Sequence, residues 1–205
     1  MRLVRDIRRA RPPRAAYTLL EVVISIGLVA LVVTNIVLAL DSSTKAYEVG
    51  STRIEVEDQA RRTLDRIALA VMGSSREGLA PGQEYPLDTD SLTYQLHLGY
   101  QNGVAVWSDP ERIAREEQQA QIAWSKNPGN ADEQRVVWTK WVRETMDGEI
   151  PGNGLDDNGN GLIDEKGLSF TIEQDLVTIR LTLEKNGPDG RPVTVALDTQ
   201  VGVRN

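Results

Sequence analysis

The chain has 205 residues, a formal net charge of −7, 40% apolar residues and 26% charged residues. This balance is that of a folded protein, and the length suits one domain with an appendage. There is no cysteine and one histidine, His97, which excludes disulfides, thiolate chemistry and a histidine-based metal cluster. Six arginines lie in residues 1–16, so the remainder is strongly acidic and nucleic-acid binding is not expected.

The first predicted element is a membrane span that follows a basic leader. Residues 1–16 are the arginine-rich leader, and residues 17–40 carry Glu21 as their single charged residue. A helix of that length rises about 36 Å, enough to cross a hydrocarbon core about 30 Å thick. Because basic flanks stay on the cytoplasmic side, the sequence predicts a single-pass membrane protein with a cytoplasmic N-terminus and an exported C-terminal domain.

Glu21 is unusual because an ionised carboxylate inside a span is costly unless it is paired. Cleavage after Ala16 would create a positive α-amino group on Tyr17, and Glu21 would become the fifth residue of the product. The amine could meet the carboxylate of its own chain or of a staggered neighbour, which would favour one axial offset between helices. The alternative is an uncleaved signal anchor with an incidental acid near the membrane surface.

The stretch AAYTLLEVVISIGLVALV (residues 15–32) resembles the prepilin-type segment of type IV pilins and type II secretion pseudopilins. The resemblance implies that a prepilin peptidase cuts after Ala16 and methylates Tyr17, and that Glu21 acts in filament assembly. The family usually has glycine before the cut, where this chain has alanine. The implied partners are other pilin or pseudopilin subunits, the peptidase and the inner membrane. The implied location is the bacterial inner membrane, with the C-terminal domain periplasmic or extracytoplasmic.

Residues 41–73 are predicted to continue the same helix in amphipathic form, because apolar residues recur at helical spacing among charged ones. Opposite charges four residues apart are expected to pair Glu57 with Arg61 and Asp58 with Arg62. A glycine and two serines then end the helix.

Residues 74–205 predict an exported β-rich domain. Alternating side chains predict a strand over residues 91–100 with its leucines and tyrosines on one buried side and His97 on the surface. Residues 110–131, rich in Glu, Gln, Arg and Ala, are expected to form either a short polar helix or an ill-ordered insertion. Further strands are expected over residues 104–107, 135–146, 168–173, 177–183 and the C-terminal segment.

This order predicts an α+β, pilin-like fold, in which a long N-terminal helix, membrane-spanning in its first half, packs on an antiparallel sheet. The strand pattern and the ending TQVGVRN resemble the W-type minor pilins and the minor pseudopilin J of type II secretion, which tend to finish on Arg-Asn, here Arg204 and Asn205. Pseudopilins G, I and K remain open.

Residues 147–167 contain a second distinctive motif, DDNGNGLIDE, which resembles the D-x-D-x-D-G calcium loops of exported proteins. The spacing aims alternate oxygens at one point, and glycine allows the sharp turn. Gly167 stands where a regular EF-hand has its last glutamate, so Glu165 or Asp147 is expected to supply that carboxylate. The predicted ligands of a structural Ca²⁺ are Asp156, Asn158, Asn160, the carbonyl of Leu162, Asp164 and Glu165. The alternative is a plain Asp/Asn/Gly turn.

Three functions compete. The first is a structural filament subunit that is not an enzyme. The second is a membrane-anchored calcium-dependent binding module that never polymerises. The third is an anchored hydrolase using acids such as Asp88, Asp90 or Glu144, for which the sequence offers no catalytic geometry.

Overall fold

The computed structural model describes residues 17–81 and 87–203. The chain separates into two units, Met1–Thr44 and Lys45–Asn205. Helix α1 (Leu19–Met72) begins in the first unit and ends in the second. Antiparallel sheets follow it, so the fold is α+β with one long apolar N-terminal helix, as the sequence predicts.

In the first unit, α1 exposes its apolar side chains up to Thr44. Three uncharged polar side chains of its apolar part are satisfied on the helix itself. Ser25 Oγ, Thr34 Oγ1 and Asn35 Nδ2 each donate to the carbonyl four residues earlier at 2.8 Å. A helix also pairs its own backbone polar groups, which lipid requires. By length and composition, α1 is the single candidate membrane span among the described residues.

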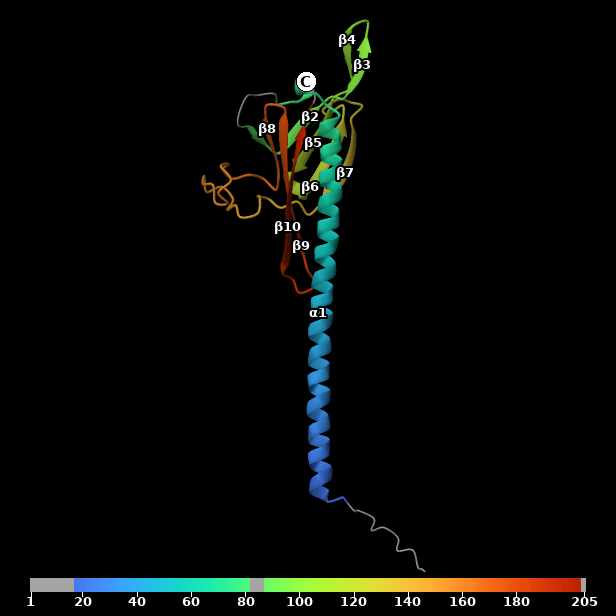
Figure 1. Cartoon of the computed structure of the whole chain (residues 1–205), viewed down its shortest axis with the longest axis vertical. Coiled ribbons are helices and arrows are strands. Elements are labelled where there is room, and N and C mark those ends of the chain that lie inside the picture. Colours follow the sequence, from blue (N-terminus) through green and yellow to red (C-terminus); the bar gives the residue numbers. More distant parts are fainter. Residues whose placement is uncertain (1–16, 82–86, 204–205) are drawn as a thin grey trace, which may run out of the picture. The chain divides into compact units, whose positions relative to one another are not determined.

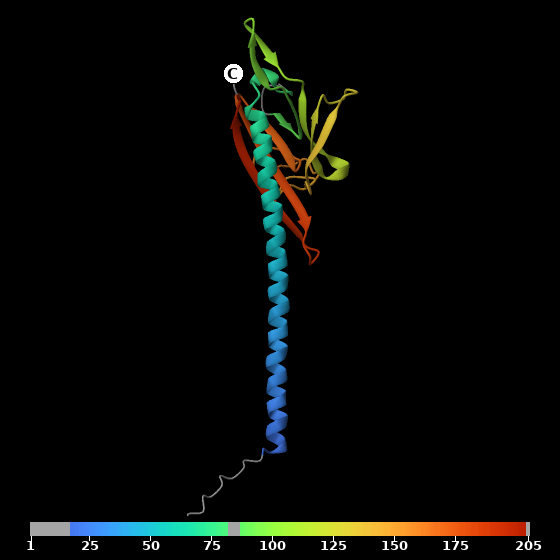
Figure 2. The same cartoon turned by 90° about the vertical axis from the view of Figure 1, so that its right-hand side faces the viewer.

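In the second unit, the remainder of α1 buries one side in the core (Figures 1 and 2). Its buried apolar residues recur every three or four positions, as an amphipathic helix requires. They are Val56, Ala60, Leu64, Ile67 and Val71. On the solvent side the predicted ion pairs are confirmed, with Arg61–Glu57 at 2.7 Å and Arg62–Asp58 at 2.8 Å.

Two four-stranded antiparallel sheets supply most of the remaining core. The first has the order β1 (Leu87–Thr89), β8 (Leu168–Glu173), β9 (Leu176–Asn186) and β10 (Pro192–Gly202). The second has the order β2 (Ser91–Tyr94), β5 (Glu111–Glu116), β6 (Gln121–Lys126) and β7 (Gln134–Lys140). Two short 3-10 turns, η1 (Arg76–Gly78) and η2 (Glu117–Gln119), lie between elements.

The prediction for residues 110–131 is wrong, because this segment forms β5 and β6 with η2 between them. Ile113 of β5 and Ile122 of β6 are fully buried. Arg115 and Gln121 are buried polar residues of the same two strands. The polar composition therefore conceals two strands of the second sheet.

The strand predicted over residues 91–100 is also interrupted. β2 ends at Tyr94, and a separate hairpin of β3 (His97–Gln101) and β4 (Val104–Trp107) extends away from the two larger sheets (Figure 1). The register shifts between His97 and Gly99, where Gly99 has φ +121°. In this separate hairpin Leu98 and Tyr100 are 63% and 74% exposed instead of buried. The surface position predicted for His97 is confirmed.

The strand predicted over residues 135–146 ends at Lys140, but the next residues still extend the first sheet. Residues 141–143 pair with β9 next to the first residue of β8. The bonds are Arg143 N to Thr182 O at 3.0 Å and Glu184 N to Trp141 O at 2.7 Å. This pairing fixes the start of the long loop over residues 147–167 in the second unit.

Candidate functional site

The first candidate site is the opening turn of α1, where Thr18 and Glu21 form reciprocal hydrogen bonds. Glu21 Oε2 accepts from Thr18 N, and Thr18 Oγ1 accepts from Glu21 N, each at 3.3 Å. This is a capping box, which satisfies two of the unpaired N–H groups at a helix start. The spacing T-L-L-E carries this signal, which the sequence reasoning above did not use.

The predicted processing residues lie at or beyond this turn. Ala16 falls outside the described residues. Tyr17 is 80% exposed, and Glu21 is exposed as well. Glu21 takes part in none of the ion pairs between described residues. Its carboxylate is directed to the backbone at Thr18, one residue from the nitrogen that cleavage would turn into an amine.

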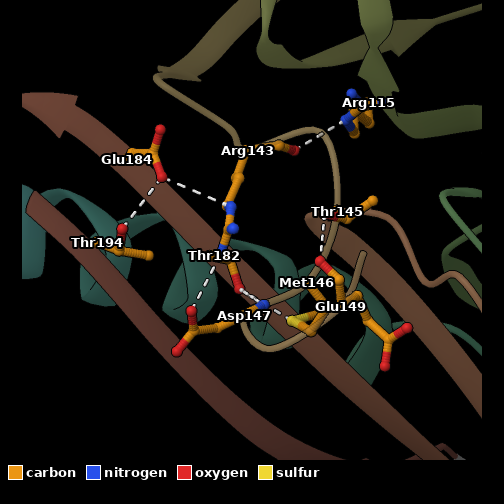
Figure 3. A network of polar contacts seen from close by, with 9 residues as sticks. All are labelled: Arg115, Arg143, Thr145, Met146, Asp147, Glu149, Thr182, Glu184 and Thr194. Carbon is orange, nitrogen blue, oxygen red and sulfur yellow. Dashed lines mark hydrogen bonds and ion pairs between the residues drawn. The ribbon is translucent and has the colours of Figure 1, made fainter. Parts of the chain in front are cut away.

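The second candidate site is the loop over residues 147–167, which starts from a polar network on β9 (Figure 3). Arg143 pairs with Asp147 at 3.0 Å and with Glu184 at 3.5 Å. Asp147 N donates to Thr182 Oγ1 at 3.3 Å, and Thr182 Oγ1 lies 2.9 Å from Met146 Sδ. Asp147 is thus held by Arg143 and the β9 side of the network, so the prediction that it supplies a loop carboxylate is not supported.

The C-terminal end of the loop is hydrogen-bonded to β9 and to the segment before the loop. Gly167 O accepts from Thr182 N at 2.7 Å, and Gly167 N donates to Glu144 O at 3.3 Å. A Cβ at Gly167 would collide with the backbone carbonyl of Arg143. The position where an EF-hand carries its last glutamate therefore has no room for a side chain in this loop.

Asp156, Asn158 and Asn160 fold the tip of the loop inward, as their spacing predicts. Asp156 accepts the backbone N–H groups of Gly159 at 2.6 Å, Asn160 at 3.2 Å and Gly161 at 2.8 Å. Asn158 Oδ1 accepts from Asn160 N at 3.0 Å, and Asn160 Oδ1 accepts from Leu162 N at 2.9 Å. These bonds bring three predicted ligands into one tight turn.

Asp164 is turned to a different part of the loop. Its carboxylate accepts from Asn153 N at 3.2 Å and from Gly154 N at 2.9 Å. These bonds hold the second half of the loop against the first half. Asp164 and Asp156 therefore bind different backbone groups and share none of these hydrogen bonds. Leu162 donates its own N–H to Asn160, and no described interaction engages its carbonyl as a ligand.

Two glutamates beside the turn are buried, and the sequence reasoning named only one of them. Glu165 is 0% exposed and Glu149 is 3% exposed. Glu149 Oε1 accepts from Asn158 N at 3.1 Å, and Glu165 Oε1 contacts Asn160 Nδ2. The second oxygen of each carboxylate has no hydrogen-bond partner among the described residues. The signal available in the sequence was an acid at either side of an Asp/Asn/Gly turn.

The donor chemistry of this loop suits a hard cation. The side-chain oxygens near the turn that could bind a metal belong to carboxylates and amides, which are ligands that Ca²⁺ prefers. Among the described residues, however, no three acidic or histidine side chains gather into one metal-sized group. Any cation held here would rest on two carboxylates and neutral oxygens.

Comparisons with known proteins give no assignment. No protein-family model matches the chain. No curated protein and no solved structure matches it significantly.

Proposed function

We propose that the chain is a structural subunit of a type IV pilus-like or type II secretion pseudopilus filament, of the W-type minor pilin or J-type pseudopilin kind, and not an enzyme. Before assembly, the subunit spans the bacterial inner membrane with its N-terminus in the cytoplasm and its β-rich domain outside. A prepilin peptidase cuts after Ala16 and methylates Tyr17. The apolar helices then pack together into the filament.

One observation carries the proposal: Glu21 is an acid in the first turn of a helix otherwise suited to lipid, and it has no cationic partner among the described residues. An ionised group at such a position calls for pairing or protonation. Cleavage after Ala16 would place a positive amine on Tyr17, next to the Thr18 N–H that Glu21 already contacts at 3.3 Å. The same amine could pair with Glu21 of a neighbouring subunit.

The other polar side chains of the segment support the same account. Ser25, Thr34 and Asn35 are satisfied by carbonyls of their own helix, so they demand no partner from outside. Glu21 differs from them because a hydrogen bond to Thr18 does not neutralise its charge. The segment therefore has an apolar surface that suits lipid or other apolar helices. It also has one charged residue, Glu21, that needs an opposite charge.

The capping box favours a second candidate, a membrane-anchored module that never polymerises. Glu21 would then be retained because it caps α1, with no assembly role. Glutamine also serves at this position of a capping box, since its amide oxygen accepts the same N–H. Glu21→Gln therefore removes the charge while keeping the cap, and it separates the two candidates.

The test compares Glu21→Gln with Ser25→Ala in native cells. Ser25 lies one helical turn further along and bonds only to the Glu21 carbonyl at 2.8 Å, so its alanine variant is a matched polar deletion. We expect both variants to remain in the membrane pellet after alkaline extraction. We expect only Glu21→Gln to be lost from the sheared filament fraction and from cross-links to other subunits.

Normal recovery of Glu21→Gln in filaments would overturn the pairing account. Absence of the wild-type chain from every filament fraction would support the anchored module instead.

A further inference from the structure

The loop over residues 147–167 contains two buried acids whose charges are not balanced by described residues. Glu149 Oε2 and Glu165 Oε2 are buried and have no hydrogen-bond partner. Neither glutamate belongs to any ion pair between described residues. An ionised carboxylate out of water is costly unless something pairs with it. Each therefore requires a proton or a cation.

The backbones of both glutamates form hydrogen bonds with the same residue, Met146. Met146 N donates to Glu165 O at 2.8 Å, and Met146 O accepts from Glu149 N at 3.2 Å. Thr145 Oγ1 also donates to Glu149 O at 3.3 Å, which holds that residue against the base of the loop (Figure 3). The backbone of both glutamates is thus tied to Thr145 and Met146 at the base of the loop.

The turn at residues 158–160 lies against both carboxylates. Asn158 N–H binds Glu149 Oε1, and Asn160 Nδ2 contacts Glu165 Oε1. The Asn158 amide oxygen also contacts Asn160 N at 3.0 Å, so neutral oxygens sit in the segment that connects the two acids. Turning the Asn160 amide over would place its oxygen beside Glu165 and would give up the bond from Leu162 N–H to that oxygen. The turn can therefore offer amide oxygens to a cation held by the two glutamates.

We propose that Glu149 and Glu165 are the anionic ligands of a Ca²⁺ site, with the amide oxygens of Asn158 and Asn160 completing its protein ligands. Two carboxylates balance one divalent charge, and the oxygen-only set in a glycine-rich loop suits the adaptable coordination of Ca²⁺ better than the strict octahedron of Mg²⁺. This assignment differs from the regular loop pattern, in which Asp156 and Asp164 would lead. Here Asp156 shapes the turn and Asp164 ties it to residues 153–154.

The site has a structural role in this proposal. It links the base of the loop to its tip, so bound Ca²⁺ stabilises the folded domain by mass action. With two carboxylates and neutral oxygens as its protein ligands, the site is expected to have a dissociation constant of about 10⁻⁴ to 10⁻³ M. The inference does not rest on the proposed filament function, because it concerns only residues of the second unit.

The experiment uses the full chain in detergent micelles after removal of metal with a chelator. Isothermal titration with CaCl₂ is expected to show binding, and Ca²⁺ near saturation is expected to raise the melting temperature by about 5 °C. MgCl₂ at equal ionic strength should give little of either effect. Glu149→Gln and Glu165→Gln should each weaken Ca²⁺ binding at least about tenfold, consistent with loss of a charged ligand.

Glu173→Gln is the matched control, because Glu173 is an exposed residue of β8 outside the loop. It should bind Ca²⁺ as the wild type does. Absence of binding heat together with one melting temperature in Ca²⁺, Mg²⁺ and chelator would overturn the site, even if the loop variants fail to fold. So would wild-type affinity in either loop variant. If the acids are instead protonated, Glu165→Gln without metal will match the wild type in stability and neither protein will respond to calcium.

Discussion

Glu21 caps its own helix, and the proposed filament function would give the same carboxylate a second role. Within the chain it accepts the N–H of Thr18 and so completes the first turn of α1. That contact also keeps the carboxylate near the backbone of Tyr17, where cleavage would release an amine. A residue needed for capping in the precursor would then be positioned for pairing in the product. The two roles differ in one property, because capping needs an oxygen and pairing needs a charge.

A second polar group, in the second sheet, illustrates a buried network that is satisfied within the domain. Tyr94 Oη donates to Glu111 Oε2 at 2.6 Å, and Trp124 Nε1 donates to the same oxygen at 2.8 Å. Tyr94 is only 2% exposed. Burial and then the hydrogen bond to the Glu111 carboxylate raise the pKa of Tyr94 well above its ordinary value. The folded domain therefore favours the neutral phenol.

This network predicts a loss of stability at high pH. A folded-state pKa above the unfolded value stabilises the fold fully below the unfolded pKa of about 10, and that contribution is lost as pH rises through the folded pKa. Tyr94→Phe cannot ionise, so its free energy of unfolding should fall less than that of the wild type between about pH 8 and about pH 11. Urea unfolding followed by circular dichroism measures this difference, and parallel pH profiles would contradict it.

Helix α1 is part of the core of the second unit because one side of it is buried with the strands. Leu64 is 7% exposed, whereas Leu69 on the same helix is 69% exposed. Lys185 of β9 binds Glu55 of the helix with both contacts at 2.8 Å, and Gln59 Nε2 donates to Trp138 O at 3.0 Å. The polar contacts at the edge fix the rotation of the helix that the apolar side requires.

Two matched truncations test this packing. Leu64→Ala should lower the free energy of unfolding by about 2–5 kcal/mol, because it leaves a cavity in the core. Leu69→Ala makes the same chemical change at a position facing outward and should change it by less than about 0.5 kcal/mol. Denaturant unfolding of the full chain in micelles measures both values. Equal effects of the two substitutions would mean that the helix does not pack as described.

Regular side-chain patterns predicted some elements well and others not at all. The amphipathic half of α1 and the strands β8 and β9 follow from the spacing of their apolar residues. β5 and β6 do not, because their buried positions include Arg115 and Gln121, which composition assigns to the surface. The strand predicted over residues 91–100 is interrupted between Tyr94 and His97, ahead of the register shift at Gly99, and the alternation of side chains does not mark that break.

The candidate sites divide in the same way. The turn formed by Asp156, Asn158 and Asn160 could be predicted, because these residues bind backbone groups a fixed distance along the chain. The burial of Glu149 could not, since it depends on how the loop folds back so that Asn158 N–H reaches the Glu149 carboxylate. Ordinary surface acids and buried acids look alike until the residues that cover them are known.

The two units present contrasting surfaces. Residues 17–40 expose an apolar helix with one acid, whereas residues 45–203 bury an apolar core of their own. An exposed apolar helix is stable against aggregation only in lipid or against other apolar helices. The proposed function assigns both environments to it in turn, first the membrane and then the filament. Proteolysis after Ala16 is the step that would connect the two states.

The most direct test is therefore mass spectrometry of the N-terminus of the protein isolated from its native cells. The account predicts a chain that begins at N-methylated Tyr17, and it predicts that Ala16→Lys retains the leader. A native chain that still begins at Met1, or one whose first residue lies beyond Leu40, would contradict it.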